Sequence, residues 1–144
     1  MNNYGSYIRS FFALLILVMV MLSCSKLSEL SSGGDASKLY FCEKYVLNSD
    51  ECEGKSTKYS PGRLTVMVDI RPTKKKLGVE SVNINVTDIK SGEVVETFPF
   101  DTKADMDYVY FEDVNFKKAG KYKVSALKPD GTVIVTNEIE IVDN

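Results

Sequence analysis

The residue types that carry most enzyme chemistry are sparse in this chain. It contains no histidine and three cysteines, Cys24, Cys42 and Cys52. Without an imidazole there is no Ser-His-Asp or Cys-His pair, and no side chain that normally titrates near neutral pH. The sequence also lacks a recognisable catalytic motif. We therefore expect a protein that is not an enzyme and that carries no cofactor and no metal.

Cys24 follows an unbroken apolar run over residues 11–22, which is preceded by a polar segment with one positive charge, Arg9. The run is shorter than the ~20 residues that a membrane-spanning helix needs, and it fits the h-region of a signal peptide. The tetrapeptide MLSC, residues 21–24, resembles the lipobox of bacterial lipoproteins, with methionine in place of the usual leucine. The resemblance implies a signal peptide over residues 1–23 and a diacylglyceryl anchor, typically with palmitate, on Cys24. Plain secretion and a buried apolar helix are the alternatives.

Cys42 and Cys52 remain as a pair if Cys24 carries lipid. Export would place them in an oxidising compartment. A bridge would close a loop of 11 residues and stabilise the fold by roughly 3 kcal/mol. We expect a disulfide, with two free thiols as the first alternative. A metal site is a weaker alternative, because two thiolates without histidine would need carboxylates to complete four ligands.

One basic segment is a candidate binding site. The sequence RPTKKK, residues 71–76, is predicted to be a loop between two strands and contains Arg71, Lys74, Lys75 and Lys76. Loops on a rigid scaffold often carry binding residues. One interpretation is therefore contact with an anionic partner, such as lipid head groups, a glycan or an acidic protein. The other is a solvated loop that discourages edge pairing.

Carboxylates gather between residues 101 and 113. Oxygen ligands of this kind can bind calcium, but the alternating ligand spacing of a calcium loop is missing. They show no recognisable acid–base pairing either. The residues concerned are Asp101, Asp105, Asp107, Glu112 and Asp113.

Aromatic residues flank the first cysteine of the expected disulfide. Tyr40, Phe41 and Tyr45 lie within three residues of Cys42. Tyrosine suits adaptable binding surfaces, so this segment is either a ligand-facing loop or part of the packing of the domain.

The rest of the chain predicts a flexible tether and one β domain. Residues 24–37 are rich in Ser and Gly, which favours a tether, and residues 38–144 have the length of one small domain.

Apolar and polar residues of this domain alternate with period 2, as in RLTVMVDI, residues 63–70, which predicts β-strands. Asn137 interrupts the last alternation and indicates a bend or bulge. The seven expected strands cover residues 38–45, 63–70, 81–88, 93–100, 107–113, 120–127 and 132–142.

Seven short strands in about 100 residues are typical of an antiparallel immunoglobulin-like sandwich; an up-and-down barrel is the alternative. The segment AGKYKV, residues 119–124, resembles the corner before strand F in that superfamily. The resemblance implies that the Tyr122 hydroxyl bonds back to the corner and that Val124 is a core residue. There is no tryptophan and no inter-sheet cysteine pair, so the domain is more similar to the cysteine-poor sandwiches of bacterial envelope proteins than to antibody domains.

The charge balance of the chain argues against nucleic acid as a partner. From Cys24 onward the chain has 17 basic and 20 acidic residues, a net charge of −3, whereas nucleic-acid binders carry a concentrated basic face. We expect an exported envelope lipoprotein that acts as a non-catalytic binding module for a protein or for an envelope or host-surface partner. A structural or assembly subunit of an envelope complex is the alternative; a small-ligand carrier or an enzyme is less favoured. Ser25 does not resemble the aspartate that retains some lipoproteins in the inner membrane, which favours the outer membrane.

Overall fold

A computed structural model describes residues 36–143. The predicted signal peptide, Cys24 and the predicted tether up to residue 35 lie outside the described residues. Among residues 36–143, no helix is long and apolar enough to span a bilayer.

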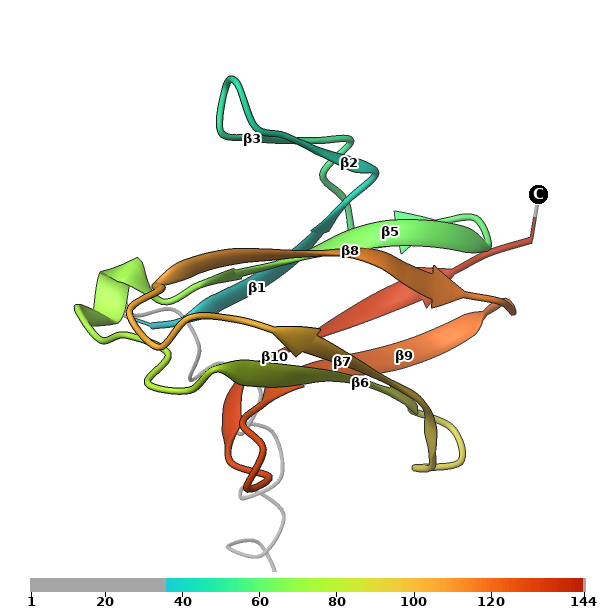
Figure 1. The fold of residues 1–144 in the computed structure, drawn as a ribbon. Coiled ribbons are helices and arrows are strands. Elements are labelled where there is room, and N and C mark those ends of the chain that lie inside the picture. Colours follow the sequence, from blue (N-terminus) through green and yellow to red (C-terminus); the bar gives the residue numbers. More distant parts are fainter. Residues whose placement is uncertain (1–35, 144) are drawn as a thin grey trace, which may run out of the picture. The chain divides into compact units, whose positions relative to one another are not determined.

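Seven long strands form two facing sheets (Figure 1). The three-stranded sheet has the order β1-β5-β8, and the five-stranded sheet has the order β4-β10-β9-β6-β7. All pairs are antiparallel except the short β4, which runs parallel to β10. The bounds are β1 Lys38–Cys42, β4 Lys58–Tyr59, β5 Gly62–Asp69, β6 Ser81–Asp88, β7 Val94–Asp101, β8 Tyr108–Phe116, β9 Gly120–Leu127 and β10 Val133–Ile141.

The first, second and fifth long strands lie in one sheet and the other four in the second. An immunoglobulin-like sandwich has this grouping of the first, second and fifth strands against the third, sixth and seventh. The fourth, β7, pairs with β6 in the second sheet, and the short β4 is added at the other edge of that sheet. The predicted all-β sandwich is confirmed. Its core is made by the inward residues of both sheets, including Phe41, Val66, Ile84, Phe111, Val114, Val124 and Ile139.

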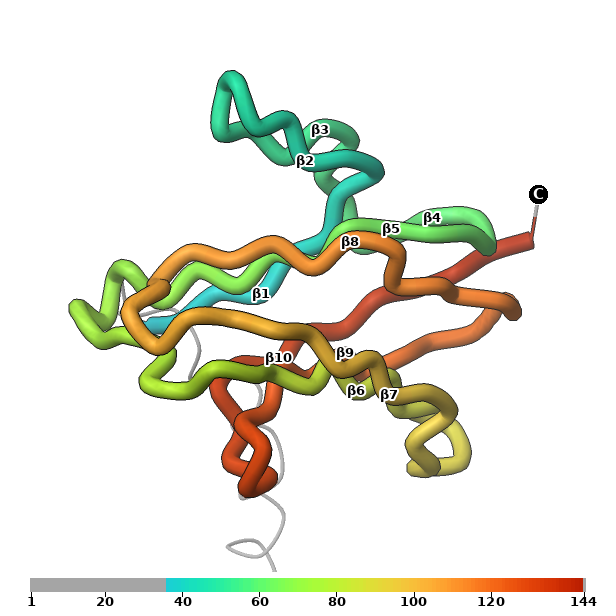
Figure 2. The backbone as a smooth tube through the Cα atoms, in the orientation of Figure 1, coloured from blue at the N-terminus to red at the C-terminus, as the bar shows by residue number. Residues whose placement is uncertain are grey.

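The prediction of one continuous strand over residues 38–45 is wrong, because β1 ends at Cys42. At Glu43 the chain leaves the sheet and forms a separate hairpin of β2 (Lys44–Val46) and β3 (Glu51–Glu53). Figure 2 shows this hairpin standing away from the two sheets. The charged Glu43 occupies the parity of the buried Leu39 and Phe41, so the apolar alternation ends where the chain leaves the sheet, and the predicted strand ran past that signal.

Asn137 also differs from its prediction. The irregular register of β10 lies between Val133 and Val135, not at Asn137. The Asn137 Nδ2 donates to the Leu39 carbonyl at 2.8 Å, and its Oδ1 accepts the Glu138 N–H at 2.8 Å. Because Leu39 is in β1, this amide joins the two sheets along one side of the sandwich.

The corner before β9 is confirmed. The Tyr122 hydroxyl donates to the Lys118 carbonyl at 3.0 Å, and Val124 is fully buried. A Cβ on Gly120 would lie 3.3 Å from the Tyr122 ring, so glycine leaves the room that the ring needs. The corner thereby fixes where the chain re-enters the five-stranded sheet.

We expect Tyr122→Phe to lower the free energy of unfolding by about 1 kcal/mol, because it leaves the Lys118 carbonyl without its donor. Denaturant unfolding followed by far-ultraviolet circular dichroism measures the change. Tyr110→Phe is the matched control, because within residues 36–143 its hydroxyl makes no hydrogen bond. Equal losses in both variants would contradict a role for this hydrogen bond.

Candidate functional site

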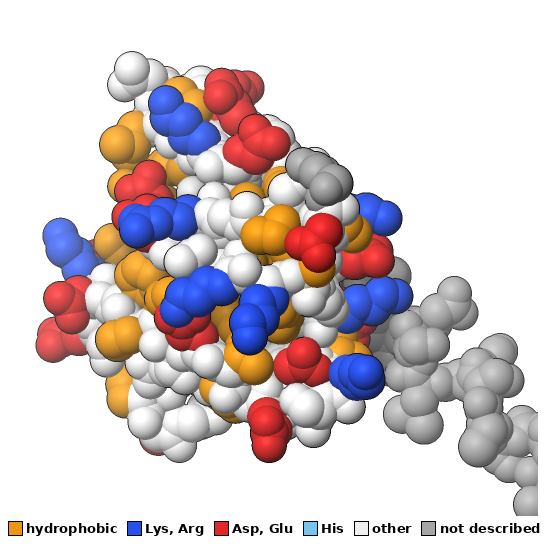
Figure 3. Space-filling model, turned by 90° about the vertical axis from the view of Figure 1, so that its right-hand side faces the viewer, with side chains coloured by type: hydrophobic (Ala, Val, Ile, Leu, Met, Phe, Trp, Pro, Cys, Tyr) orange, Lys and Arg blue, Asp and Glu red, His pale blue; other side chains and the backbone are white. Residues whose placement is uncertain are grey.

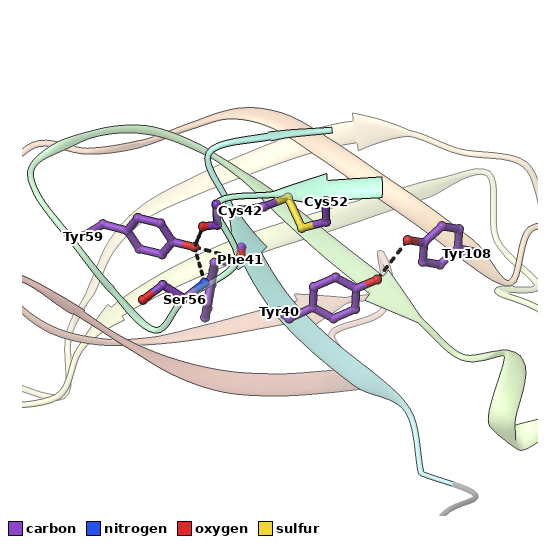
Figure 4. Close-up of a disulfide and its surroundings, with 8 residues drawn as sticks. Tyr40, Phe41, Cys42, Cys52, Ser56, Tyr59 and Tyr108 are labelled. Carbon is purple, nitrogen blue, oxygen red and sulfur yellow. Dashed lines mark hydrogen bonds between the residues drawn. A yellow bond between two sulfur atoms is a disulfide. The ribbon is translucent and has the colours of Figure 1, made fainter. Parts of the chain in front are cut away.

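The outer face of the three-stranded sheet carries an unusual set of side chains. Tyr40, Met67 and Tyr110 face one another across β1, β5 and β8, and Tyr108 lies in the neighbouring row opposite Asp69. The Tyr40 and Tyr108 hydroxyls are hydrogen-bonded at 2.9 Å (Figure 4). Tyr45 of the hairpin stacks on Tyr110 with ring centroids 4.3 Å apart. We call the surface of Tyr40, Tyr45, Tyr108 and Tyr110 the tyrosine face.

A covalent bond ties the projecting hairpin to the end of β1. Cys42, at the end of β1, is bonded to Cys52 in β3, as predicted, with their Cα atoms 5.5 Å apart. Thr65 and Met67, which the alternation places on the outer face of β5, are buried. Both faces of β5 are therefore covered, whereas alternation alone predicts one solvent-facing side.

Tyr59 is a second connection at the base of the hairpin. Its hydroxyl accepts the Ser56 N–H at 2.7 Å and lies 2.9 Å from the Phe41 carbonyl and 2.7 Å from the Gly54 carbonyl (Figure 4). One hydroxyl proton serves these two carbonyls in turn. Three backbone groups around the disulfide loop thus share one buried oxygen, although the Ser56 N–H also reaches the Phe41 carbonyl at 3.4 Å.

Arg71, in the basic loop, lies next to the tyrosine face, which includes Tyr40 and Tyr45 of the aromatic segment around Cys42. Its guanidinium binds both carboxylate oxygens of Asp69, at 2.9 and 2.8 Å, and lies over the Tyr108 ring, 3.8 Å from the centroid. Lys55 lies in the same way over Tyr40, at 3.7 Å. The basic loop and the aromatic segment around Cys42 therefore meet at the tyrosine face.

The four basic residues of the loop do not act as one cluster. Arg71 is paired with Asp69 and Lys76 with Asp107. Lys74 and Lys75 are exposed and have no ion pair within residues 36–143. The anionic contact predicted for Arg71, Lys74, Lys75 and Lys76 therefore depends mainly on the two middle lysines.

Several tyrosine hydroxyls have raised pKa values. Burial and the hydrogen bond to Tyr108 raise the pKa of Tyr40, while the hydrogen bond to Asp50 raises that of Tyr45 to about 12. Burial also raises the pKa of Tyr59. The Arg71 guanidinium lowers the pKa of Asp69, so this ion pair persists into mildly acidic solution.

These shifts predict alkaline destabilisation. In the unfolded chain a tyrosine loses its proton near pH 10, whereas the folded chain still holds these protons. Above pH 10 the unfolded state therefore binds fewer protons, and stability falls as pH rises through the folded values, with Tyr45 titrating at about 12. Denaturation midpoints measured from pH 8 to 12 test this, and Tyr40→Phe should flatten the decline; a constant midpoint would contradict it.

The carboxylates between residues 101 and 113 do not converge. Asp107 is paired with Lys76, and Asp113 with Arg63 at 3.1 Å. Within the described part of the chain, no three Asp, Glu or Cys side chains are placed to hold a metal ion. The calcium alternative therefore has no supporting geometry.

A hollow of about 340 Å³ lies between the sheets at the end where Tyr122 is located. Val86 and Phe116 contribute to its apolar wall, and Lys117 and Glu96, which also line it, form a 3.0 Å ion pair. The Tyr122 hydroxyl is already bound to the Lys118 carbonyl. Because most of its polar groups are paired within the protein, this hollow is a weaker candidate than the tyrosine face.

Sequence reasoning identified Tyr40, Tyr45 and Arg71 but missed Tyr59, Tyr108 and Tyr110. The missed signal is the segment YVY, residues 108–110, where both outward positions of a strand are tyrosine. An outward pair of aromatic residues on a predicted strand indicates a covered or binding face.

Comparison with known proteins adds little. No protein-family model matches the chain, and no curated protein matches it. The soluble domain of PmoD from Methylocystis sp. ATCC 49242 (Rockwell) is similar with a TM-score of 0.43 and 13% identity, over 76% of this chain and 94% of that one. An endonuclease/exonuclease/phosphatase from Beutenbergia cavernae DSM 12333 has a TM-score of 0.30 and 16% identity, over 56% of this chain and 21% of that one. Both likenesses are too weak to support an argument about function.

Proposed function

We propose that this chain is a lipid-anchored protein of the bacterial envelope, favoured at the outer membrane, whose sandwich is a non-catalytic binding module. Two features support export and anchoring. The sequence around Cys24 resembles a lipobox, and disulfides such as Cys42–Cys52 persist mainly in oxidising compartments.

The tyrosine face is the observation that carries the binding function. All four of its tyrosines are partly exposed, and tyrosine presents an apolar ring together with a polar hydroxyl, which suits interfaces. The disulfide, the Tyr45–Tyr110 stack and the Arg71–Tyr108 contact hold these rings before any partner arrives. Preorganisation of this kind reduces the ordering cost of binding. The expected partner is a protein or a molecule on a host surface.

Photocrosslinking in intact cells tests this function. A benzoylphenylalanine at Lys55, which lies on the tyrosine face, should give a crosslinked adduct. The same residue at Thr97, exposed on the outer side of the five-stranded sheet, should give none. Excess purified chain should compete the adduct away, and a Tyr108→Ser chain should compete poorly.

Equal adducts from both positions, or none from Lys55, would contradict binding through the tyrosine face. An adduct to a stable multiprotein envelope complex would instead favour the alternative function of an assembly subunit.

A further inference from the structure

The chain enters the sandwich at the end that carries the basic loop. Lys38, the first residue of β1, faces Asp69, the last residue of β5, and Arg71 follows two residues later. Figure 1 shows the start of β1 and the short helical turn of Arg71–Thr73 at the same end. We call this the entry end, defined by Lys38 and by residues 70–80, 102–107 and 128–132.

The entry end is the basic end of the described domain. Its connecting segments contain six Lys and Arg residues against four Asp and Glu, and the adjoining strand ends add Lys38, Asp69 and Asp101. The connections at the opposite end, residues 43–61, 89–93, 117–119 and 142–143, have six of each. Figure 3 views that opposite end and shows basic and acidic side chains interspersed. The domain is therefore polarised along its strands.

Part of this positive charge is not neutralised by neighbours. Lys74 and Lys75 are exposed and lack an ion pair within residues 36–143, in contrast to Arg71 and Lys76. Lys128 belongs to the same surface, because its ammonium nitrogen would lie 3.9 Å from a Cβ placed on Gly78. The carboxylates of the entry end that are not in an ion pair within the described chain are Glu80, Asp105 and Asp130, and Asp101 ends the adjoining strand β7.

We infer that the entry end docks on anionic lipid head groups of the membrane that holds the anchor, with Lys74 and Lys75 as its principal contacts. This inference rests on the proposed lipid anchor at Cys24. Cys24 is 14 residues before Lys38, so the intervening chain reaches at most about 50 Å. A tether of this length keeps the lysines at a high effective concentration near the lipid surface. Each contact is weak and screened within about 10 Å at 0.1 M salt, so docking orients the domain without immobilising it.

Docking at the entry end has a functional consequence. The tyrosine face runs along the strands from this end, whereas the disulfide-bonded hairpin follows the far end of β1. With the entry end on the membrane, the hairpin side of the tyrosine face is directed away from the lipid, where a partner can reach it.

Lysine footprinting of the native, full mature chain tests the inference. The detergent-extracted protein is reconstituted into vesicles of phosphatidylcholine alone or with one third phosphatidylglycerol, and is acetylated by a water-soluble reagent. Lys74 and Lys75 should react several-fold more slowly in the anionic vesicles at low salt. High salt should abolish the difference. Lys90 and Lys118, exposed at the opposite end, should react equally in both.

Charge reversal provides the matched comparison. Lys128, on the same surface, should also react more slowly in the anionic vesicles. Lys74→Glu with Lys75→Glu should remove this protection of Lys128, whereas Lys90→Glu with Lys118→Glu makes the same charge change and should preserve it. Flotation of the vesicles in a density gradient shows whether the chain is bound to them. If the chain floats with both kinds of vesicle but Lys74 and Lys75 react equally in both, the docking inference alone is overturned. If the chain floats with neither, the anchor on which the inference rests is overturned.

Discussion

Replacing both Cys42 and Cys52 with alanine is expected to lower the free energy of unfolding by about 3 kcal/mol. The bridge closes a loop of 11 residues, and the chain-entropy estimate for such a loop is roughly 3 kcal/mol. That is a large fraction of the 5–15 kcal/mol typical of a domain. Equilibrium unfolding in urea, followed by circular dichroism, measures the loss.

The loss of stability should be concentrated in the hairpin of β2 and β3. The Glu43 N–H donates to the Glu53 carbonyl at 2.9 Å, next to the disulfide, so hydrogen exchange at this amide should accelerate far more than exchange in β6 or β9. Ser49→Ala, in the exposed hairpin turn, is the control that should change neither property. Uniform acceleration across the domain would show that the bridge does not act through the hairpin.

Tyr59→Phe is expected to destabilise the fold by about 2 kcal/mol, because it removes an oxygen that three backbone groups share in a buried setting. The ring remains, so its packing is unchanged. Tyr110→Phe again provides a comparison in which a hydroxyl without a hydrogen bond in the described chain is removed. Denaturant midpoints of the two variants give the difference.

Combining Tyr59→Phe with the double cysteine variant separates two explanations. Both changes loosen the base of one hairpin, so their costs should not add. A combined loss smaller than the sum of the separate losses is the expected result. Strict additivity would mean that Tyr59 and the disulfide stabilise independent parts of the domain.

The sequence predicted the sandwich well because its signals are local. Alternation in β6 matches the burial of the strand residue by residue, and the Tyr122 corner is contained within six residues of sequence. Predicted bounds for β6 and β9 coincide with the observed strands. The bridge that the structure contains was predicted from the cysteine count, with Cys24 assigned to lipid, and from the expected export.

The candidate site was harder to predict because its contacts join distant segments. The Tyr40–Tyr108 hydrogen bond spans 68 residues, and the stack of Tyr45 on Tyr110 spans a similar separation. The break at Glu43 does have a local signal, since this charged residue follows Leu39 and Phe41 on the inward parity of β1, but the direction that the chain takes afterwards depends on the distant rings that Tyr45 meets. Asn137 was read as a defect of its own strand, whereas its partner is the carbonyl of Leu39 in the other sheet.

The most direct test of an exported, anchored and disulfide-bonded protein is the intact mass of the natively expressed chain. The protein would be extracted from membranes with detergent and weighed with and without reduction. We predict a chain that begins at Cys24, is heavier by acyl groups, and gains two hydrogens on reduction as Cys42 and Cys52 are released. An unmodified chain that retains Met1 and gains no hydrogens would contradict the account.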